Sequence, residues 1–305
     1  DWKVDFVKIT ENTLKGPLFL KSVKAAHARG YIVSGHVPID LTIEELVDAG
    51  LSSVEHASYL LRLGCNEQQI VADLKAGKIT SAEANHLYQT TFDPQVAMKN
   101  YAVLGKKGLY VTPTLIGSRQ LAYLNENDYT KDSMMVSYLT KAYAENYTWR
   151  IERMKNDTPE QSEERKKRTQ FTASQVPLMQ KAGIPILAGS DEAALNSFVY
   201  PGESLISELQ LFQDAGMQPV HILQAATING AKFMRKSATM GSVDEGKIAD
   251  MVILDENPLE NINATQRIYG VFTKGQYFDR NALNKILQHV KEAKIKLDTQ
   301  REMVR

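Results

Sequence analysis

The stretch Pro185-Ile186-Leu187-Ala188-Gly189-Ser190-Asp191 decides the fold of this chain. Its apolar residues predict a short buried strand, and the Gly-Ser-Asp ending puts a carboxylate where that strand ends. Four other short stretches share this design, an apolar run that ends on a polar side chain. Those runs end on Lys8, His36, His56 and Thr112. If these strands lie parallel, Lys8, His36, His56 and Asp191 project from one rim of the sheet.

The first 56 residues alternate between predicted strands and predicted helices with short connections, which is typical of parallel βαβ units. Pro17 suits the first turn of a helix that Gly30 ends. Thr42 and Glu45 have the spacing of a capping box at the start of a second helix, which ends at Gly50. The predicted strands are residues 4–9, 31–35 and 51–55. This pattern predicts the α/β class.

Two long polar segments interrupt the alternation, residues 60–107 and 117–182. Both have helical patterns, and the strand 109–112 lies between them. The charged run 160–168 is typical of a solvated helix or loop. Because both segments follow strands, we expect them above the rim, where they can form a lid or a substrate wall.

The sequence changes character after Asp191. Two apolar-periodic helices are predicted at about 203–215 and 218–235, and residues 236–280 then contain short β-type runs between turn residues. The tail predicts an amphipathic helix with one shared apolar face, Leu283, Ile286, Leu287, Val290 and Leu297. We therefore divide the chain into an α/β part (1–235), a small β part (236–280) and a C-terminal helix (281–305).

Composition narrows the function classes. The 305 residues are 43% hydrophobic and 24% charged, as in an ordinary globular protein, and 36 basic residues balance 36 acidic ones. Overall charge therefore gives no support for a nucleic-acid or membrane-surface role, and no apolar run is long enough to span a membrane.

Cys65 is the only cysteine, so no internal disulfide can form. The first residue is Asp1, so we expect a processed or partial chain, and a cytoplasmic or an exported location both stay open.

The rim residues are compatible with a metal site. A single histidine at a strand end is more often a hydrogen-bonded structural residue, but His36 and His56 end successive strands at equivalent points. Neutral imidazole suits zinc and its neighbours in the first transition row. Asp191 can cap a helix, or it can bind a metal and act as a general base. Lys8 is either an ordinary surface or ion-paired lysine or, after carbamylation by carbon dioxide, an anion that can bridge two metal ions roughly 3.5–4 Å apart.

The chain resembles the metal-dependent amidohydrolase superfamily, in particular its imidazolonepropionase-like and Xaa-Pro dipeptidase-like branch. Short motifs in a specific order carry the resemblance through almost the whole chain: Val4-Asp5-Phe6-Val7-Lys8-Ile9, Ser34-Gly35-His36-Val37-Pro38, Ser53-Val54-Glu55-His56, Val111-Thr112-Pro113-Thr114-Leu115, Ala188-Gly189-Ser190-Asp191, Ala225-Ala226-Thr227-Ile228-Asn229-Gly230-Ala231, Gly246-Lys247-Ile248-Ala249-Asp250 and Asn257-Pro258-Leu259.

The resemblance implies a TIM-like (β/α)8 barrel with a small β-sandwich, of which this chain holds barrel strands four to eight, part of the sandwich and the C-terminal helix. It implies that Lys8 is the carbamylated bridge, that His36 and His56 bind the more exposed metal ion, and that Asp191 binds the buried ion and shuttles the proton. The implied cofactor is one or two divalent ions. Zinc is favoured by ligand type, and manganese, cobalt and iron stay open.

The sequence also departs from the family pattern, because it contains no His-x-His motif for the end of strand one. The resemblance implies that the first three barrel strands are missing as well. A complete barrel of this kind needs about 250 residues before insertions, so we expect the C-terminal portion of a roughly 400-residue enzyme. Five strands alone would leave open sheet edges.

The predicted activity is hydrolysis of a C–N bond in an amide, a cyclic amide or a small peptide by a metal-activated water. One alternative is a truncated or partner-dependent fragment without activity, and another is a mononuclear deaminase of the same superfamily, against which Lys8 argues. A non-enzymatic α/β binding module explains the strands but not the rim residues. Tyr59 and Arg119 are expected near the rim as ligands of a substrate carboxylate. The substrate and the oligomeric state, including a homo-oligomer, stay open.

Overall fold

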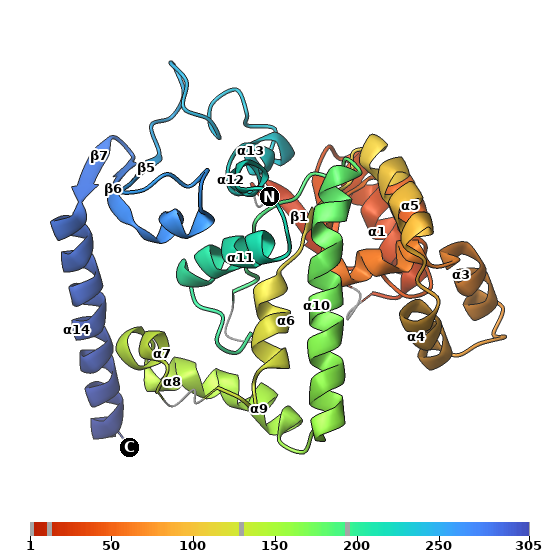
Figure 1. The fold of residues 1–305 in the computed structure, drawn as a ribbon, viewed down its shortest axis with the longest axis horizontal. Coiled ribbons are helices and arrows are strands. Elements are labelled where there is room, and N and C mark those ends of the chain that lie inside the picture. Colours follow the sequence, from red (N-terminus) through yellow and green to blue (C-terminus); the bar gives the residue numbers. More distant parts are fainter. Residues whose placement is uncertain (1–2, 11–13, 128–130, 193–195, 305) are drawn as a thin grey trace.

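The computed structural model describes residues 3–10, 14–127, 131–192 and 196–304. Its first part alternates strands and helices, which confirms the predicted α/β class (Figure 1). The strands of the first sheet pair in parallel, in the order in which they occur in the chain. They are β1 (Phe6–Ile9), β2 (Ile32–Gly35), β3 (Leu51–Glu55) and β4 (Tyr110–Thr112). The carboxyl ends of these strands therefore meet at one rim.

The stretch 185–188 takes the next position beside β4. Ile186 forms a parallel bridge with Val111, and the Leu187 amide donates to the Val111 carbonyl at 2.8 Å. The Ala188 amide then turns away and donates to the Ala225 carbonyl at 3.0 Å. Asp191 has a φ of 54°, in the left-handed region. The predicted strand 185–191 is thus wrong in its length, since its Gly-Ser-Asp ending leaves the sheet direction.

The two faces of the parallel sheet differ in polarity. Registered pairs put Lys8 beside Ser34, Ser34 beside Ser53, and Glu55 beside Thr112 on one face. The opposite face carries buried apolar side chains, among them Val33, Val54 and Val111. Side chains alternate between the faces of a strand, so the apolar face packs on helices and the polar face leads up to the rim.

Helices follow each strand and fill both interruptions, as predicted. The Thr42–Glu45 capping box is present at the start of its helix. The elements between the strands are α1 (Gly16–Ala28), α2 (Ile43–Asp48), η1 (Ala57–Gly64), α3 (Glu67–Lys75), α4 (Ser81–Thr90) and α5 (Pro94–Lys106). After β4 come α6 (Leu115–Ala122), α7 (Ser133–Tyr138), α8 (Lys141–Ala144), η3 (Glu145–Tyr147), α9 (Thr148–Met154) and α10 (Pro159–Lys181).

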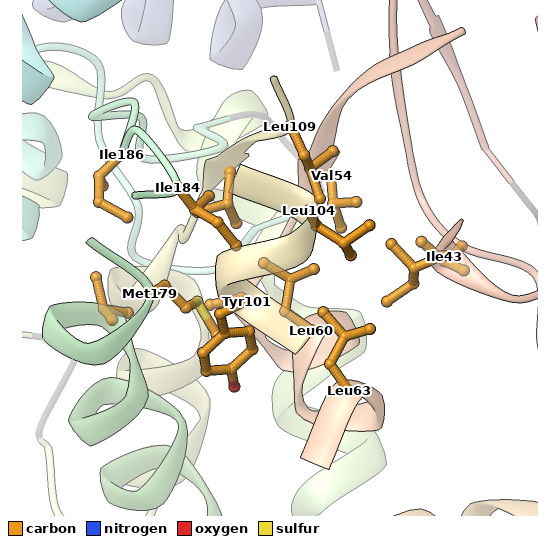
Figure 2. Packing of buried hydrophobic residues seen from close by; sticks show 14 of the residues in the cluster. Ile43, Val54, Leu60, Leu63, Tyr101, Leu104, Leu109, Met179, Ile184 and Ile186 are labelled. Atoms are coloured by element: carbon orange, nitrogen blue, oxygen red, sulfur yellow. The ribbon is translucent and has the colours of Figure 1, made fainter. Parts of the chain in front are cut away.

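The main core lies between the sheet and its helices (Figure 2). Val54 and Leu109 from the sheet region meet Leu104 of α5, and Leu60 of η1 meets Tyr101. Ile184 and Ile186 join the same cluster, which ties the incomplete fifth strand to the sheet. Burial of a side chain of this size stabilises a fold by about 1.5–3 kcal/mol. This packing fixes the strands whose carboxyl ends form the rim.

The remaining elements are α11 (Glu203–Asp214), α12 (Pro219–Ala226), α13 (Ile228–Phe233), β5 (Met251–Leu254), η4 (Ile262–Gln266), β6 (Ile268–Thr273), β7 (Gln276–Asp279) and α14 (Arg280–Val304). The predicted helix 218–235 is wrong in being continuous, because Thr227 breaks it with φ −135° and ψ −93°. The break lies two residues after Ala225, whose carbonyl accepts the Ala188 amide. Strands β5, β6 and β7 form an antiparallel sheet.

The described residues confirm the parallel sheet, the small antiparallel sheet and the C-terminal helix. The closure of the parallel strands into a barrel and the place of β5–β7 in a β-sandwich stay predictions. None of the described helices combines the length and the apolar character needed to cross a membrane.

Candidate metal centre

The rim of the parallel sheet brings together Lys8, His36, His56 and Asp191. The Nε2 atoms of His36 and His56 lie 3.0 Å apart. His56 Nε2 lies 4.0 Å from Asp191 Oδ2, and Asp191 Oδ1 lies 3.7 Å from Lys8 Nζ. Residues far apart in the sequence thus form one cluster, because each lies near the end of a strand or follows one at the same edge of the sheet.

A glycine sets the position of His36. The His36 amide donates to the Ile9 carbonyl at 3.1 Å, at the end of β1. A Cβ atom on the preceding residue, Gly35, would lie 2.4 Å from that carbonyl oxygen, which is closer than real Cβ contacts. Gly35 therefore lets β1 and β2 approach and brings the His36 ring to the rim.

His56 is held by the loop after β4. Its amide donates to the Thr112 carbonyl at 2.8 Å, and its Nδ1 lies 2.5 Å from Thr114 Oγ1. The Thr114 hydroxyl lies 2.8 Å from the Pro113 carbonyl, and with its hydrogen assigned to that carbonyl its oxygen accepts from Nδ1–H of His56. This tautomer leaves the lone pair on Nε2, the atom that faces His36.

The surroundings of His56 favour the neutral ring. Burial lowers the pKa of His56, and the neighbouring His36 ring lowers it further, while the charge of Asp191 acts in the opposite direction. The side chain is 25% exposed. A neutral imidazole is the form that binds a metal ion, so the site favours the competent form of this residue.

Asp191 is oriented by side chains from two other segments. Asn196 donates to Asp191 Oδ2 at 2.9 Å and to the Asp191 carbonyl at 2.5 Å. Arg150 of α9 in turn donates to Asn196 Oδ1 at 2.7 Å. The second interruption therefore reaches the rim, where the sequence predicts a lid or a wall.

Lys8 makes an ion pair with Asp191, and both side chains are 35% exposed. Solvent screens a pair of this kind, which contributes at most about 1 kcal/mol to stability. In this form the lysine is an ammonium donor and not a metal ligand. Only its carbamylated form has oxygen atoms to offer a metal ion.

The two histidines fit one metal ion. Ligand nitrogens on a tetrahedral zinc ion lie about 3.4 Å apart, given zinc–nitrogen bonds of about 2.1 Å, which is about 0.4 Å more than the 3.0 Å between the two Nε2 atoms. At this distance a hydrogen bond from one Nε2–H to the other Nε2 also accounts for the contact. Within the described residues, no group of three or more His, Cys, Asp and Glu side chains is arranged to hold a metal. Asp191 is the nearest further ligand.

Three strand-end residues have a positive φ, namely His56 (75°), Thr114 (50°) and Asp191 (54°). They are half of the six non-glycine residues in this conformation among those the structure describes. Such backbone costs about 1–3 kcal/mol per residue and clusters at functional sites. The local strain therefore coincides with the predicted site.

Tyr59 and Arg119 have different surroundings. The Tyr59 ring stacks on both histidines, with centroids 5.6 Å from His36 and 6.2 Å from His56. The Arg119 guanidinium lies over the Tyr123 ring at 5.4 Å. Tyr59 is thus in direct contact with the cluster of rim residues, while the ring contact of Arg119 is within its own segment.

Sequence reasoning missed several residues that support the site. Thr114, Asn196 and Arg150 orient His56 and Asp191. Glu55 lies below the rim, where its Oε1 accepts from the Ser34 hydroxyl at 2.6 Å and the Ser53 hydroxyl at 3.2 Å. A signal for Thr114 was present, because it follows Pro113 at the end of a predicted strand. No local pattern marks Asn196 or Arg150.

The amidohydrolase family model matches residues 10–277, so the chain belongs to the amidohydrolase family. This confirms the resemblance inferred from the motifs. Ochratoxinase of Aspergillus niger is 38% identical over 88 residues, which are 28% of this chain and 17% of that protein. Imidazolonepropionase of Thermoplasma volcanium is 30% identical over 102 residues, 33% of this chain and 24% of that protein.

Solved structures share the fold. Bottromycin amidohydrolase matches 96% of this chain and 59% of its own, with a TM-score of 0.67 and 21% identity. A Xaa-Pro dipeptidase with bound methionine matches 91% and 55%, with a TM-score of 0.57 and 18% identity. The chain thus spans little more than half the length of these proteins.

Proposed function

We propose that this chain carries part of the active site of a metal-dependent hydrolase that cleaves a C–N bond in an amide, a cyclic amide or a small peptide. The observation that supports the proposal most strongly is the 3.0 Å approach of the His36 and His56 Nε2 atoms beside Asp191 and Lys8. Membership of the amidohydrolase family supports the same reaction class. Relatives named as an amidohydrolase, a dipeptidase and an ochratoxinase agree with it.

His36 and His56 would hold a divalent metal ion through Nε2, with Asp191 as a further ligand. Zinc is the preferred ion by ligand type, and carbamylated Lys8 would join the site if two ions bind. A bound ion of this kind polarises the substrate carbonyl and acidifies water. Asp191 Oδ2 is held by Asn196, so the carboxylate is oriented to take a proton from the attacking water and to pass it to the leaving nitrogen.

Tyr59 is proposed to contact the substrate. Besides stacking on the histidines, it lines a cavity of about 710 Å³ between η1, α4 and α10. The cavity walls also include Phe92, Phe171, Lys167, Arg168 and Glu164, so they combine apolar groups with two cationic groups and one acidic group. Arg119 stays a proposed contact as well. A substrate whose apolar group ends in a carboxylate suits such surroundings, and unchanged kinetics in Tyr59→Phe or Arg119→Ala would remove that residue from the proposal.

Two alternatives remain. The ligands proposed in this chain are two histidines and one carboxylate, so one alternative is a truncated or partner-dependent fragment that is inactive alone. A mononuclear deaminase-type reaction is the other alternative, and the position of Lys8 near Asp191 argues against it.

The test is metal binding and hydrolysis on the same sample. We expect the 305-residue chain to bind zinc with an affinity that His36→Ala and His56→Ala each lower strongly, while His221→Ala, on α12 and outside the cluster of rim residues, changes nothing. Release of an amine from N-acyl amino acids and proline-containing dipeptides would establish the reaction class. Zinc binding without hydrolysis would favour the partner-dependent alternative. Zinc affinities that are unchanged in His36→Ala and His56→Ala would show that these histidines are not the ligands.

A further inference from the structure

Glu208 of α11 is a buried carboxyl group without an assigned role. Its side chain is fully buried. Its two oxygens accept from consecutive amides at the start of α6, Oε1 from Leu115 at 2.8 Å and Oε2 from Ile116 at 2.7 Å. Burial raises the pKa of Glu208 to about 8, and the two amide hydrogen bonds act against this rise. A carboxyl group in such a costly position needs a structural or functional reason.

The reason lies in the residue before α6. Thr114 occupies the N-cap position of this helix, where a threonine hydroxyl normally accepts from the amides of the first turn. Here the Thr114 side chain makes no capping hydrogen bond, because its hydroxyl bonds His56 Nδ1 and the Pro113 carbonyl instead. Glu208 reaches across from α11 and takes over the first-turn amides.

We propose that Glu208 is a positioning residue for His56: by capping α6 from another helix, it leaves the Thr114 hydroxyl free to hold the imidazole with Nε2 toward His36. This inference deepens the proposed function, since it rests on His56 serving as a ligand through Nε2. The connection runs from Glu208 through two backbone amides to Thr114 and the ring. None of these groups would touch the substrate.

Without Glu208, the first-turn amides of α6 and Nδ1–H of His56 would compete for the Thr114 hydroxyl as an acceptor. With the carboxylate gone, the Leu115 and Ile116 amides lie unpaired in a buried place, which costs about 1–3 kcal/mol for each group. The Thr114 hydroxyl, on the N-cap residue, is the side-chain acceptor that ordinary capping would offer to the Ile116 amide. If Thr114 turns to cap the helix, His56 Nδ1 loses its acceptor and the ring is no longer held in one tautomer.

The experiment is nitrogen-15 NMR of the histidine side chains in the full chain, without metal, at a pH where His56 is neutral. The two ring nitrogens have distinct shifts in the two tautomers, and the His56 signals are identified by their loss in His56→Gln. We expect wild type to show the Nδ1–H form. Glu208→Ala should give a mixture of both forms, and Glu208→Gln, which keeps one acceptor, should lie between them.

Phe212→Leu is the matched control, because Phe212 is a fully buried residue of the same helix that takes no part in the α6 cap. It should lower the melting temperature and leave the His56 signals unchanged. Unchanged His56 signals in folded Glu208→Gln and Glu208→Ala would overturn the inference. If the alanine variant does not fold, Glu208→Gln decides the question alone.

A second readout links the inference to metal binding. We expect Glu208→Gln to weaken zinc binding by about 10-fold, in the range found for residues that orient metal ligands, while Phe212→Leu keeps the wild-type affinity. The tautomer measurement needs neither metal nor substrate, so it stands if the proposed hydrolysis fails. Zinc binding that is equally weak in wild type would instead count against the proposed function.

Discussion

At the scale of single residues, the Thr114 hydroxyl is the group on which the state of His56 depends. It is the only described acceptor for His56 Nδ1, at 2.5 Å. We expect Thr114→Val, which keeps the shape of the side chain, to weaken zinc binding about 10- to 100-fold. Competition with a coloured chelator would measure this change. Thr112→Val is the control, since the Thr112 hydroxyl bonds Glu55 rather than a histidine ring and its backbone contact with His56 is kept, and equal losses in both variants would contradict the role given to Thr114.

Asp191 has a different task at the same scale, because its carboxylate is the proposed proton carrier. Asp191→Asn keeps a side chain that can bond Asn196 but removes the base, so turnover in the active protein should fall about 10²- to 10⁴-fold. Thermal unfolding should change little, since the Lys8–Asp191 pair is partly exposed. Near-normal turnover in this variant would exclude Asp191 as the proton carrier.

The sequence alone predicted the rim residues because a local pattern marks each of them. Lys8, His36, His56 and Asp191 all follow short apolar runs. The supporting contacts have no such mark. The Thr114–His56 contact spans 58 residues and the Glu208–Leu115 contact spans 93, so only the folded chain reveals them.

At the scale of elements, the spacing of β1 and β2 depends on Gly35. A methyl group there would lie 2.4 Å from the Ile9 carbonyl oxygen, and backbone cannot give way as a flexible side chain does. We expect Gly35→Ala to lower the free energy of unfolding by about 1–3 kcal/mol and to weaken zinc binding, because His36 moves with β2. Urea unfolding and the chelator assay measure the two effects.

Gly117 provides the control for this variant. It lies inside α6, and a Cβ atom added there would meet nothing within 4 Å, so Gly117→Ala should be neutral or stabilise by up to about 1 kcal/mol. A Gly35→Ala protein with wild-type stability and zinc affinity would show that the two strands can separate without cost.

Element boundaries show where sequence patterns end and tertiary contacts begin. The periodic patterns predicted β1–β4, the helical interruptions and the Thr42 capping box. The predicted strand 185–191 and the predicted helix 218–235 were both too long. The same hydrogen bond, from the Ala188 amide to the Ala225 carbonyl, lies where the strand leaves the sheet and next to the break in the helix. It joins two segments that are far apart in the sequence, so no local pattern reports it.

At the scale of the whole molecule, α14 illustrates the same limit. The pattern predicted which residues share a face of this helix, but Ile286, Val290 and Leu297 are 46%, 42% and 55% exposed. Polar contacts hold the helix instead. Asp298 accepts from the Lys141 amide at 2.8 Å, and Arg301 pairs with Glu145. In Figure 1 this helix runs along one side of the molecule, past α7. Periodicity thus predicts a helix and its apolar stripe, but not whether that stripe is covered.

Global stability should depend on pH through Glu208. Its pKa is about 8 in the folded chain, against about 4.3 for an ordinary glutamate. The folded state therefore holds a proton on this group that the unfolded state has lost. A raised pKa of this kind gives stability that is complete below about pH 4.3 and is lost as pH rises toward 8.

The prediction concerns the difference in unfolding free energy between wild type and Glu208→Gln. Other groups titrate in both proteins, so the difference isolates Glu208. We expect it to move in favour of the variant as pH rises from about 5 to about 8, by up to about 1.4 kcal/mol per pH unit. Urea unfolding at several pH values measures it. Phe212→Leu, which removes no titratable group from the same helix, should give a difference that is constant with pH. A difference between wild type and Glu208→Gln that is also constant with pH would contradict the prediction. It would mean that water or another group solvates the charged Glu208 carboxylate in the folded chain, so that burial does not raise its pKa.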